Sequence, residues 1–192
     1  MKIIVCENSR ELGKKAAQTA AEYLTGLITE KGYARIAVST GASQFDTFEA
    51  LIAADIDWSK VEMFHLDEYF DLPETHPASF RKYLKERFVS KVNLLAANFV
   101  EGTAANITEI SKKLLERPVD LGLIGIGENA HIAFNDPPAD FDITDPYILV
   151  TLNETCKRQQ VGEGWFATVD DVPKQAVSMS VHQIMQCKKI IS

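Results

Sequence analysis

The sequence has 192 residues, of which 46% are hydrophobic and 24% are charged, and its formal net charge is −7. This length suits one sizeable domain. The acidic balance argues against nucleic acid as the main partner, because no basic stripe is present to neutralise phosphates. Three widely spaced cysteines are typical of reduced thiols in a cytoplasmic protein. No apolar run reaches the roughly 18 residues of a membrane span, and the N-terminus does not resemble a signal peptide.

The first half of the chain alternates strand-like and helix-like segments. Residues 1–6 are β-prone, and Asn8 or Ser9 then begins a helix that runs to about Glu30 and ends at Gly32. The segments predicted after it are, in chain order, a strand over 34–38, a helix over about 43–54, a strand over 61–66, a polar loop over 72–77 and a helix over 79–89.

The second half continues the alternation. Its predicted segments are a weak strand near Phe99, a helix over about 107–115, a strand over 120–124, a strand over 148–152, a short helical piece, and strands over 176–180 and 188–191. Strands that alternate with helices predict a Rossmann-like, doubly wound α/β fold, with a mostly parallel sheet covered by helices on both faces. We expect a single domain over 1–192 that lacks its C-terminal portion, because no helix follows the last strand to cover it.

A small, hydroxyl-rich turn follows the strand over 34–38 and enters a helix. Free N–H groups of a first helical turn, together with hydroxyl donors, can hold a phosphate. An ordinary helix N-cap, which Ser43 would provide alone, explains the turn equally well. The residues concerned are Ser39, Thr40, Gly41, Ala42 and Ser43.

Adjacent carboxylates, Asp67 and Glu68, follow the strand over 61–66. A carboxylate at this edge of the sheet can act as a general base whose protonation state is set by burial. The alternative is that the two acids cap the following turn. A metal site is a weak alternative, because His65 and Asp67 have no obvious third ligand. We expect His65 and His182 to be structural, whereas His76 lies in a polar loop that could reach a ligand.

The segment over 125–137 places His131 between Asn129 and Asp136, directly after a buried-looking strand. Open α/β proteins bind ligands at this edge of the sheet. Asp136 could accept a hydrogen bond from one ring nitrogen and leave the other to move a proton; the alternative is a packed histidine. The segment also matches a Gly-x-Gly-x-x-Ala nucleotide fingerprint, but two prolines stop any helix within two turns, which argues against dinucleotide binding.

Together these motifs resemble the glucosamine-6-phosphate deaminase (isomerase) family. The resemblance rests on the turn over 39–43, the segment over 66–80 with its Leu-Asp-Glu-Tyr and His-Pro-Ala-Ser-Phe motifs, the segment over 125–137 and a fourth segment over 172–181. The related 6-phosphogluconolactonases share the fold and a similar Gly-x-Gly…His loop. Their loop usually lacks the Phe-Asn-acid-Pro continuation that follows His131 in this sequence.

The resemblance implies a mechanism and a set of site residues. The turn over 40–43 would hold the phosphate of glucosamine 6-phosphate, and His131, oriented by Asp136, would open the pyranose ring. Asp67 would then move the C2 proton to C1, and release of ammonia would leave fructose 6-phosphate. No metal or organic cofactor is implied. Asn129 is assigned to the catalytic group, and Glu68 and Arg158 to substrate binding.

Three positions depart from the family pattern. Asn129 stands where the family usually has an aspartate, Asp136 stands where it has a glutamate, and Glu163 or Gly164 falls where it has a phosphate-binding arginine, which Lys157 or Arg158 could replace. Galactosamine 6-phosphate or another phosphosugar therefore remains an alternative substrate. Two other functions remain open: a lactone hydrolase of the 6-phosphogluconolactonase type, and a non-catalytic phosphosugar-binding module. Assembly into a homo-oligomer is also left open.

Overall fold

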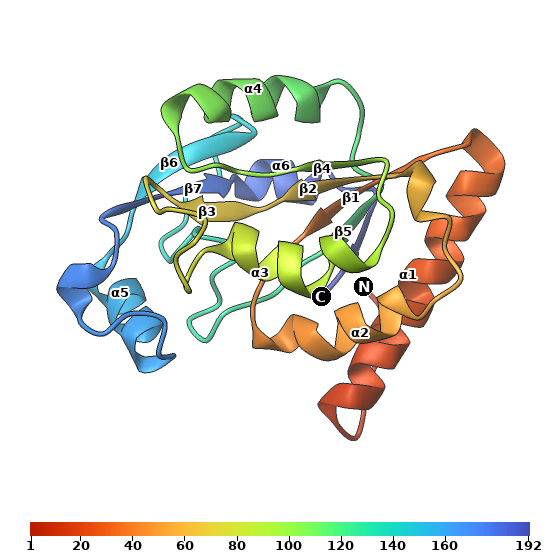
Figure 1. The fold of residues 1–192 in the computed structure, drawn as a ribbon, viewed down its shortest axis with the longest axis horizontal. Helices are drawn as coiled ribbons and strands as arrows, with labels where there is room; N and C mark the ends of the chain where they lie inside the picture. The colour runs from red at the N-terminus through yellow and green to blue at the C-terminus, as the bar shows by residue number, and fades with distance from the viewer.

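The computed structural model describes residues 1–192, and its strands form two sheets (Figure 1). The larger sheet is entirely parallel and has the order β4-β2-β1-β5-β8. Its strands are β1 (Ala34–Val38), β2 (Val61–His65), β4 (Ala96–Asn98), β5 (Leu121–Leu123) and β8 (Lys189–Ile191). The smaller sheet is antiparallel, with the order β3-β7-β6, and consists of β3 (Asp67–Tyr69), β6 (Tyr147–Thr151) and β7 (Gln175–Met179).

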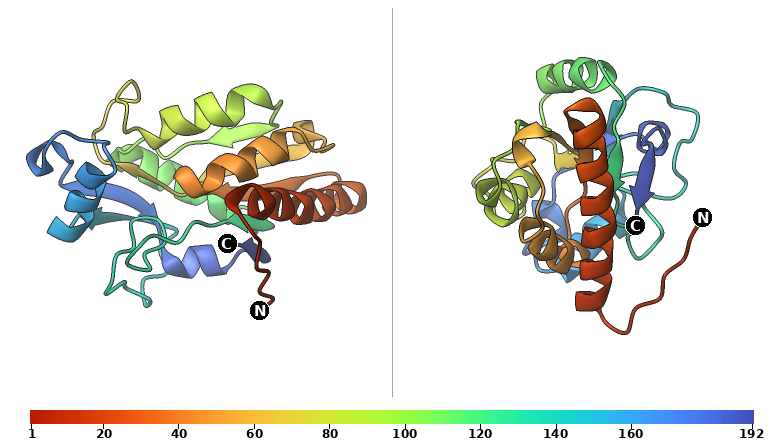
Figure 2. Two further views of the ribbon diagram at one scale, coloured as in Figure 1. Left: turned by 90° about the horizontal axis from the view of Figure 1, so that it is seen from below. Right: turned by 90° about the vertical axis from the view of Figure 1, so that its right-hand side faces the viewer.

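Helices cover both faces of the larger sheet, which confirms the predicted doubly wound α/β class (Figures 1 and 2). Three helices pack on one face: α1 (Ser9–Lys31), α2 (Phe45–Ile52) and α3 (Phe80–Arg87). The other face is covered by α4 (Ala104–Leu115), α6 (Val181–Met185) and the smaller sheet. The remaining helices are α5 (Glu154–Gly162) and the short 3₁₀ turns η1 (Ala42–Gln44), η2 (Trp58–Lys60), η3 (Val89–Lys91) and η4 (Val169–Asp171).

Local signals in the sequence set the ends of the helices. The Asn8 side chain accepts a hydrogen bond from the backbone N–H of Glu11 at the start of α1, and Gly32 ends this helix with a φ of 80°. A glycine adopts that left-handed conformation without the steric cost of a Cβ. Ser79 caps α3 in the same manner as Asn8 caps α1, by accepting from the N–H of Lys82. Both predicted helices are therefore confirmed.

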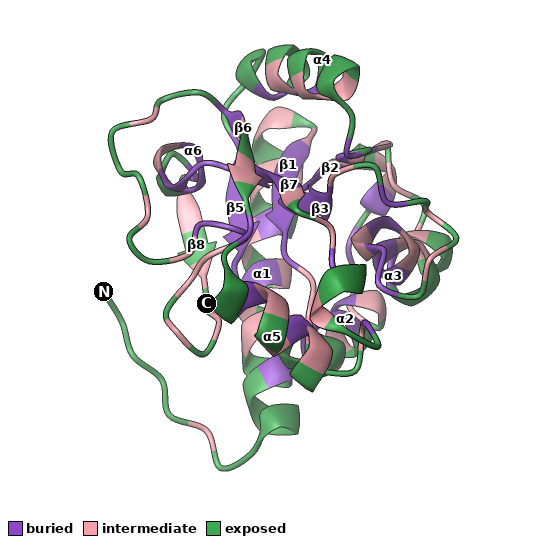
Figure 3. Cartoon of the chain, turned by 90° about the vertical axis from the view of Figure 1, so that its left-hand side faces the viewer, coloured by how far each residue is buried: buried purple, intermediate pink, exposed green.

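The alternation of side chains along β1 divides the core into two layers. Ile36 and Val38 pack beneath α1, α2 and α3, whereas Ala37 faces the opposite layer with α4 and α6. Buried residues concentrate on the strands and on the inward faces of the helices, and the outer helix faces are exposed (Figure 3). No helix is long and apolar enough to cross a membrane.

Three expectations differ from the structure. The strand over 61–66 does not stop at the sheet edge: after Leu66 the chain re-enters extended structure as β3 and joins the antiparallel sheet. Helix α6 was not expected, because five residues are too few for a periodic pattern. The β-prone residues 1–6 form no strand (Figure 2) and are mostly exposed (Figure 3), since β-propensity needs a pairing partner before it produces a strand.

Candidate active site

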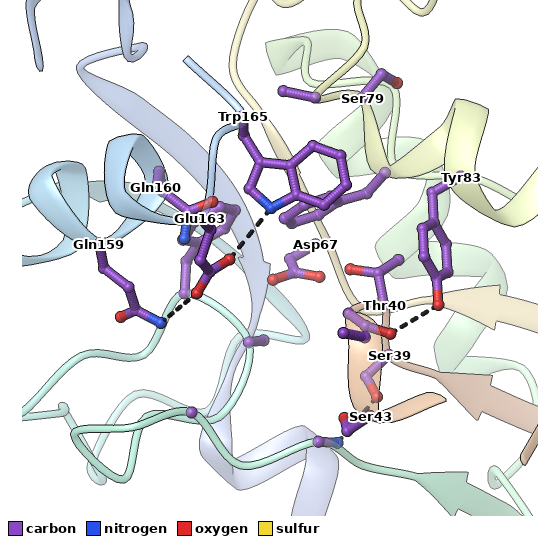
Figure 4. Close-up of a pocket in the computed structure, with 18 of the residues that line it drawn as sticks. Ser39, Thr40, Ser43, Asp67, Ser79, Tyr83, Gln159, Gln160, Glu163 and Trp165 are labelled. Carbon is purple, nitrogen blue, oxygen red and sulfur yellow. Dashed lines mark hydrogen bonds between the residues drawn. The ribbon is translucent and has the colours of Figure 1, made fainter. Parts of the chain in front are cut away.

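A pocket of about 460 Å³ opens at the carboxyl edge of the parallel sheet. Its floor is formed by the turn after β1, by Asp67 at the start of β3 and by residues 125–128 after β5, and helices α3 and α5 contribute the two walls. Figure 4 shows the Asp67 carboxylate between these walls. This volume and position are typical of a small-molecule site in an α/β protein.

The turn after β1 has both a structural and a ligand-facing part. The Ser39 hydroxyl donates to the Leu123 carbonyl (3.0 Å) and accepts from the N–H of Gly125 (2.9 Å), so it ties the ends of β1 and β5 together. Thr40 and Ser43 line the pocket (Figure 4). Neither η1 nor α2 has a side-chain N-cap, so the ordinary-cap explanation of Ser43 is wrong. Its hydroxyl remains available to a ligand.

Asp67 is a buried carboxyl group that still faces the pocket. Burial raises its pKa to about 8, and the charge of neighbouring Glu68 acts in the same direction. This side chain therefore keeps its proton at neutral pH. A carboxyl group held near the point of ionisation is well suited to accept and return a proton.

Glu68 lies next to Asp67 but points away from the pocket. Its carboxylate accepts hydrogen bonds from the Ser79 hydroxyl (2.8 Å) and the backbone N–H of Arg81 (3.0 Å), and it pairs with the Arg81 guanidinium (3.1 Å). All of these donors belong to the first turn of α3 or its cap. Glu68 thus anchors the start of α3; its side chain is fully buried and does not line the pocket.

A chain of hydrogen bonds through Asn129 to Asp136 orients the His131 ring. The Nδ1 atom of its ring lies 2.6 Å from the Asn129 Oδ1 atom, and the Asn129 amide nitrogen donates to Asp136 (3.1 Å). Because a carboxylate can only accept, this contact fixes the orientation of the Asn129 amide, and the Asn129 oxygen must then accept from Nδ1–H. Asp136 lies 3.6 Å from Nδ1 and acts on the ring mainly through Asn129.

The His131 ring packs against the backbone of its own loop, at Gly127. A Cβ atom added at Gly127 would overlap the imidazole, and the Gly127 N–H donates to the His131 carbonyl (2.9 Å). Ala130 and Ala133 have φ values of 66° and 52°, in the left-handed region that residues other than glycine rarely adopt. Such backbone conformations persist when the surrounding contacts fix them, and they are frequent at functional sites.

The contacts that fix this loop come from β7. The Ser178 hydroxyl accepts from the backbone N–H of Phe134 (3.1 Å) and from the amide of Asn135 (3.1 Å). The Asn135 amide also donates to the Met179 carbonyl (2.8 Å). Ser178 is in turn the partner of Asp67 in the register between β3 and β7. One serine therefore connects the strand that carries Asp67 to the loop that carries His131.

The two walls contain polar side chains that the sequence analysis did not assign to the site. Helix α3 contributes Lys82, Tyr83 and Arg87. On the α5 side, the Glu163 carboxylate accepts from the amide of Gln159 (2.8 Å) and the indole of Trp165 (3.1 Å) (Figure 4). The basic cluster over 81–87 alternates with apolar residues, which is typical of a solvated helix face, and Glu163 was indicated only as a candidate for the family's arginine position.

The structure brings most of the expected residues together. The turn over 39–43, Asp67 and His131 line one pocket, with Asn129 and Asp136 behind the imidazole. Arg158 is exposed on α5 and, like Glu68, does not line the pocket. His76 also lies outside it and stacks on Phe166.

His65 is fully buried against the rings of Phe80 and Phe99, and burial together with the charge of Arg81 lowers its pKa to about 3. It therefore stays neutral, as expected of a structural histidine. No cluster of three or more histidine, cysteine, aspartate or glutamate side chains is arranged to hold a metal ion.

Comparison with known proteins agrees with this architecture. Residues 7–191 match the family described as "Glucosamine-6-phosphate isomerases/6-phosphogluconolactonase", and the chain belongs to this enzyme family. It is 31% identical to glucosamine-6-phosphate deaminases of Lactobacillus delbrueckii subsp. bulgaricus and Streptococcus pneumoniae, over 100% of this chain and 80% of those proteins.

Two solved structures superpose on this chain over most of its length. A monomeric glucosamine-6-phosphate deaminase superposes with a TM-score of 0.84 at 28% identity, over 99% of this chain and 80% of that one. A 6-phosphogluconolactonase from Shewanella baltica superposes with a TM-score of 0.76 at 20% identity, over 96% of this chain and 77% of that one. The latter likeness supports the fold alone.

Proposed function

We propose that this protein is a deaminase/isomerase that converts an amino-sugar phosphate, glucosamine 6-phosphate or galactosamine 6-phosphate, to the ketose 6-phosphate and ammonia. The observation that carries the proposal is the pairing, in one pocket, of a buried carboxyl group whose pKa is about 8 with a histidine whose Nδ1 proton is fixed. This pairing supplies the two separate proton transfers that the reaction needs. The 31% identity to deaminases supports the same choice.

Ring opening is assigned to His131. Because Asn129 holds the Nδ1 proton, the Nε2 atom carries the free lone pair. Nε2 removes the proton from the anomeric hydroxyl and delivers it to the ring oxygen as the bond between C1 and that oxygen breaks. The imidazole ends this step in the form in which it began, and the sugar is now an open-chain aldehyde.

The C2-to-C1 transfer is assigned to Asp67. The ammonium group of the substrate stabilises the ionised carboxylate and so lowers its pKa on binding. The carboxylate removes the proton from C2 while a proton of the ammonium group passes to the aldehyde oxygen, which gives an enolamine. The resulting carboxylic acid then returns its proton to C1, which leaves an iminium group at C2. Water then adds to the iminium carbon at C2, and ammonia leaves to give the ketose.

The test is an assay of ammonia and of sugar products against a panel of phosphosugars. We expect ammonia and ketose 6-phosphate in equal amounts from glucosamine 6-phosphate or galactosamine 6-phosphate. Hydrolysis of 6-phosphogluconolactone without ammonia release from either amino sugar would replace the proposal by the lactonase alternative. Tight calorimetric binding with no product by NMR would indicate a binding module instead.

Replacing Gly127 by alanine tests the placement of the imidazole. The new Cβ would overlap the ring, so His131 must move off its contact with Asn129. A displacement of about 1 Å in a proton-transfer group costs on the order of 100-fold in rate. We therefore expect ammonia release to fall about 10- to 100-fold in Gly127→Ala.

Gly26→Ala provides the matched control, because nothing lies within 4 Å of a Cβ at this position in α1. Its turnover should equal that of the wild type. Full activity in a folded Gly127→Ala protein would contradict the assigned position of the ring.

A further inference from the structure

A sugar phosphate brings a dianion into a pocket that is already rich in carboxylates. The lining includes Asp67, Glu86, Glu128 and Glu163, whereas its only cationic side chains are Lys82 and Arg87 on α3. Glu163 stands on the α5 wall, where its carboxylate would repel a phosphate. Lys82 and Arg87 therefore supply the side-chain positive charge available to an anion in this pocket.

The two cations of α3 lie at different ends of the pocket. The Arg87 guanidinium lies 4.0 Å from the centre of the Phe45 ring and 5.4 Å from that of Tyr83. Both rings border the turn after β1: Phe45 is two residues beyond Ser43, and the Tyr83 hydroxyl donates to the Gly41 carbonyl (2.7 Å). Lys82 instead directs its ammonium group to the Thr75 carbonyl (3.5 Å), on the loop that precedes α3.

We propose that Arg87 is the phosphate-binding cation of this protein and acts together with the hydroxyls of Thr40 and Ser43. The inference rests on the proposed function and assigns the charge that the family's usual arginine position lacks in this chain. Stacking on Phe45 holds the guanidinium beside the turn without using its N–H donors. A planar guanidinium with free donors binds two phosphate oxygens at once, which a lysine cannot do.

The test measures anion binding and turnover separately. Calorimetry with inorganic phosphate, and steady-state kinetics with glucosamine 6-phosphate, are compared for the wild type, Arg87→Ala and Arg87→Lys. Hydrogen bonds to charged groups are worth about 1.5 to 3 kcal/mol. We therefore expect Arg87→Ala to raise the dissociation constant of phosphate and the KM about 10- to 100-fold, with kcat changed less than about threefold. The phosphate dissociation constant and the KM of Arg87→Lys should lie between those of the wild type and those of Arg87→Ala.

Lys85→Ala is the matched control, because Lys85 is a cation of the same helix that pairs with Glu74 and does not line the pocket. Its phosphate affinity and KM should equal those of the wild type. Unchanged phosphate binding in Arg87→Ala, or an equal loss in Lys85→Ala, would overturn the proposal. A wild type that releases no ammonia would refute the proposed function alone, since phosphate calorimetry on the same variants still decides the role of Arg87.

Discussion

Replacement of Asp67 by asparagine is expected to slow ammonia release by about 100- to 10,000-fold, the usual contribution of a general base. Asparagine keeps the shape of the side chain but cannot take a proton from C2. The groups proposed to bind the phosphate do not include Asp67, so the variant should still bind the sugar phosphate. The measurement is the rate of ammonia release, with Asp71→Asn as the matched control. Asp71 is exposed, lies outside the pocket and has a φ of 58°, a conformation that asparagine tolerates.

The same variant should be more stable than the wild type, by a margin that depends on pH. The folded protein keeps a proton on Asp67 up to about pH 8, whereas the unfolded chain loses it near the ordinary pKa of 3.8. Between these values the folded state binds more protons, so the stability that this group contributes falls as the pH rises. Asparagine cannot ionise, so the variant does not lose this stability as the pH rises. The free energy of unfolding of Asp67→Asn should exceed that of the wild type by a margin that grows from pH 5 to pH 8 and reaches a few kcal/mol.

Urea denaturation at pH 5, 7 and 8 measures this margin. A constant difference across these pH values would contradict the raised pKa of Asp67. Undiminished ammonia release in a folded Asp67→Asn protein would contradict its role as the base. In the wild type, kcat/KM should rise with pH until about 8 and then level off, because it reports the ionisation of the free enzyme.

Replacement of Glu68 by glutamine is expected to cost about 3 to 5 kcal/mol of folding free energy. The substitution leaves the guanidinium of Arg81 without a counterion, and Arg81 is only 9% exposed. It also exchanges one acceptor oxygen for a donor nitrogen beside the N–H groups of Phe80 and Arg81. The midpoint of urea denaturation measures the loss.

Glu74→Gln is the control for Glu68. Glu74 pairs with Lys85 at the surface, where the two side chains are 42% and 45% exposed, and such pairs contribute about 0 to 1 kcal/mol. An equal, small loss in both variants would contradict the anchoring role of Glu68. Should Glu68→Gln fail to fold, the double variant Glu68→Gln with Arg81→Met removes the unpaired charge and should recover the folded state.

The alternation of strands and helices was sufficient to predict the parallel sheet and its covering helices. Local signals such as the Asn8 and Ser79 caps are encoded within a few residues, so they can be recognised without tertiary information. The antiparallel sheet was missed because the pairing of β3 with β7 joins residues more than 100 positions apart. No periodicity within either strand indicates its partner.

The residues of the site also divide into those that a local motif indicates and those that only tertiary packing places. Asp67, Asn129, His131 and Asp136 stand in compact motifs whose residue types indicate proton transfer, and the structure places the three loop residues in contact. The different placement of Glu68 and Arg158 has a tertiary cause. The Glu68 carboxylate accepts hydrogen bonds from the start of α3, and the position of α5 directs Arg158 to solvent. Arg87 belongs to a basic cluster over 81–87 whose alternation with apolar residues is typical of a solvated helix face, and only the packing of α3 beside Phe45 brings it to the pocket.

Ser178 links the two groups to which proton transfer is assigned through contacts that do not involve the helical walls of the pocket. The spacing between Asp67 and His131 depends on the pairing of β3 with β7 and on the hydrogen bonds that Ser178 makes to the loop. Side chains of α3 and α5 also line the pocket, and neither helix takes part in that strand pairing. If the proposed function holds, substitutions on the helical walls are expected to change which sugar phosphate is accepted while Asp67 and His131 keep their spacing.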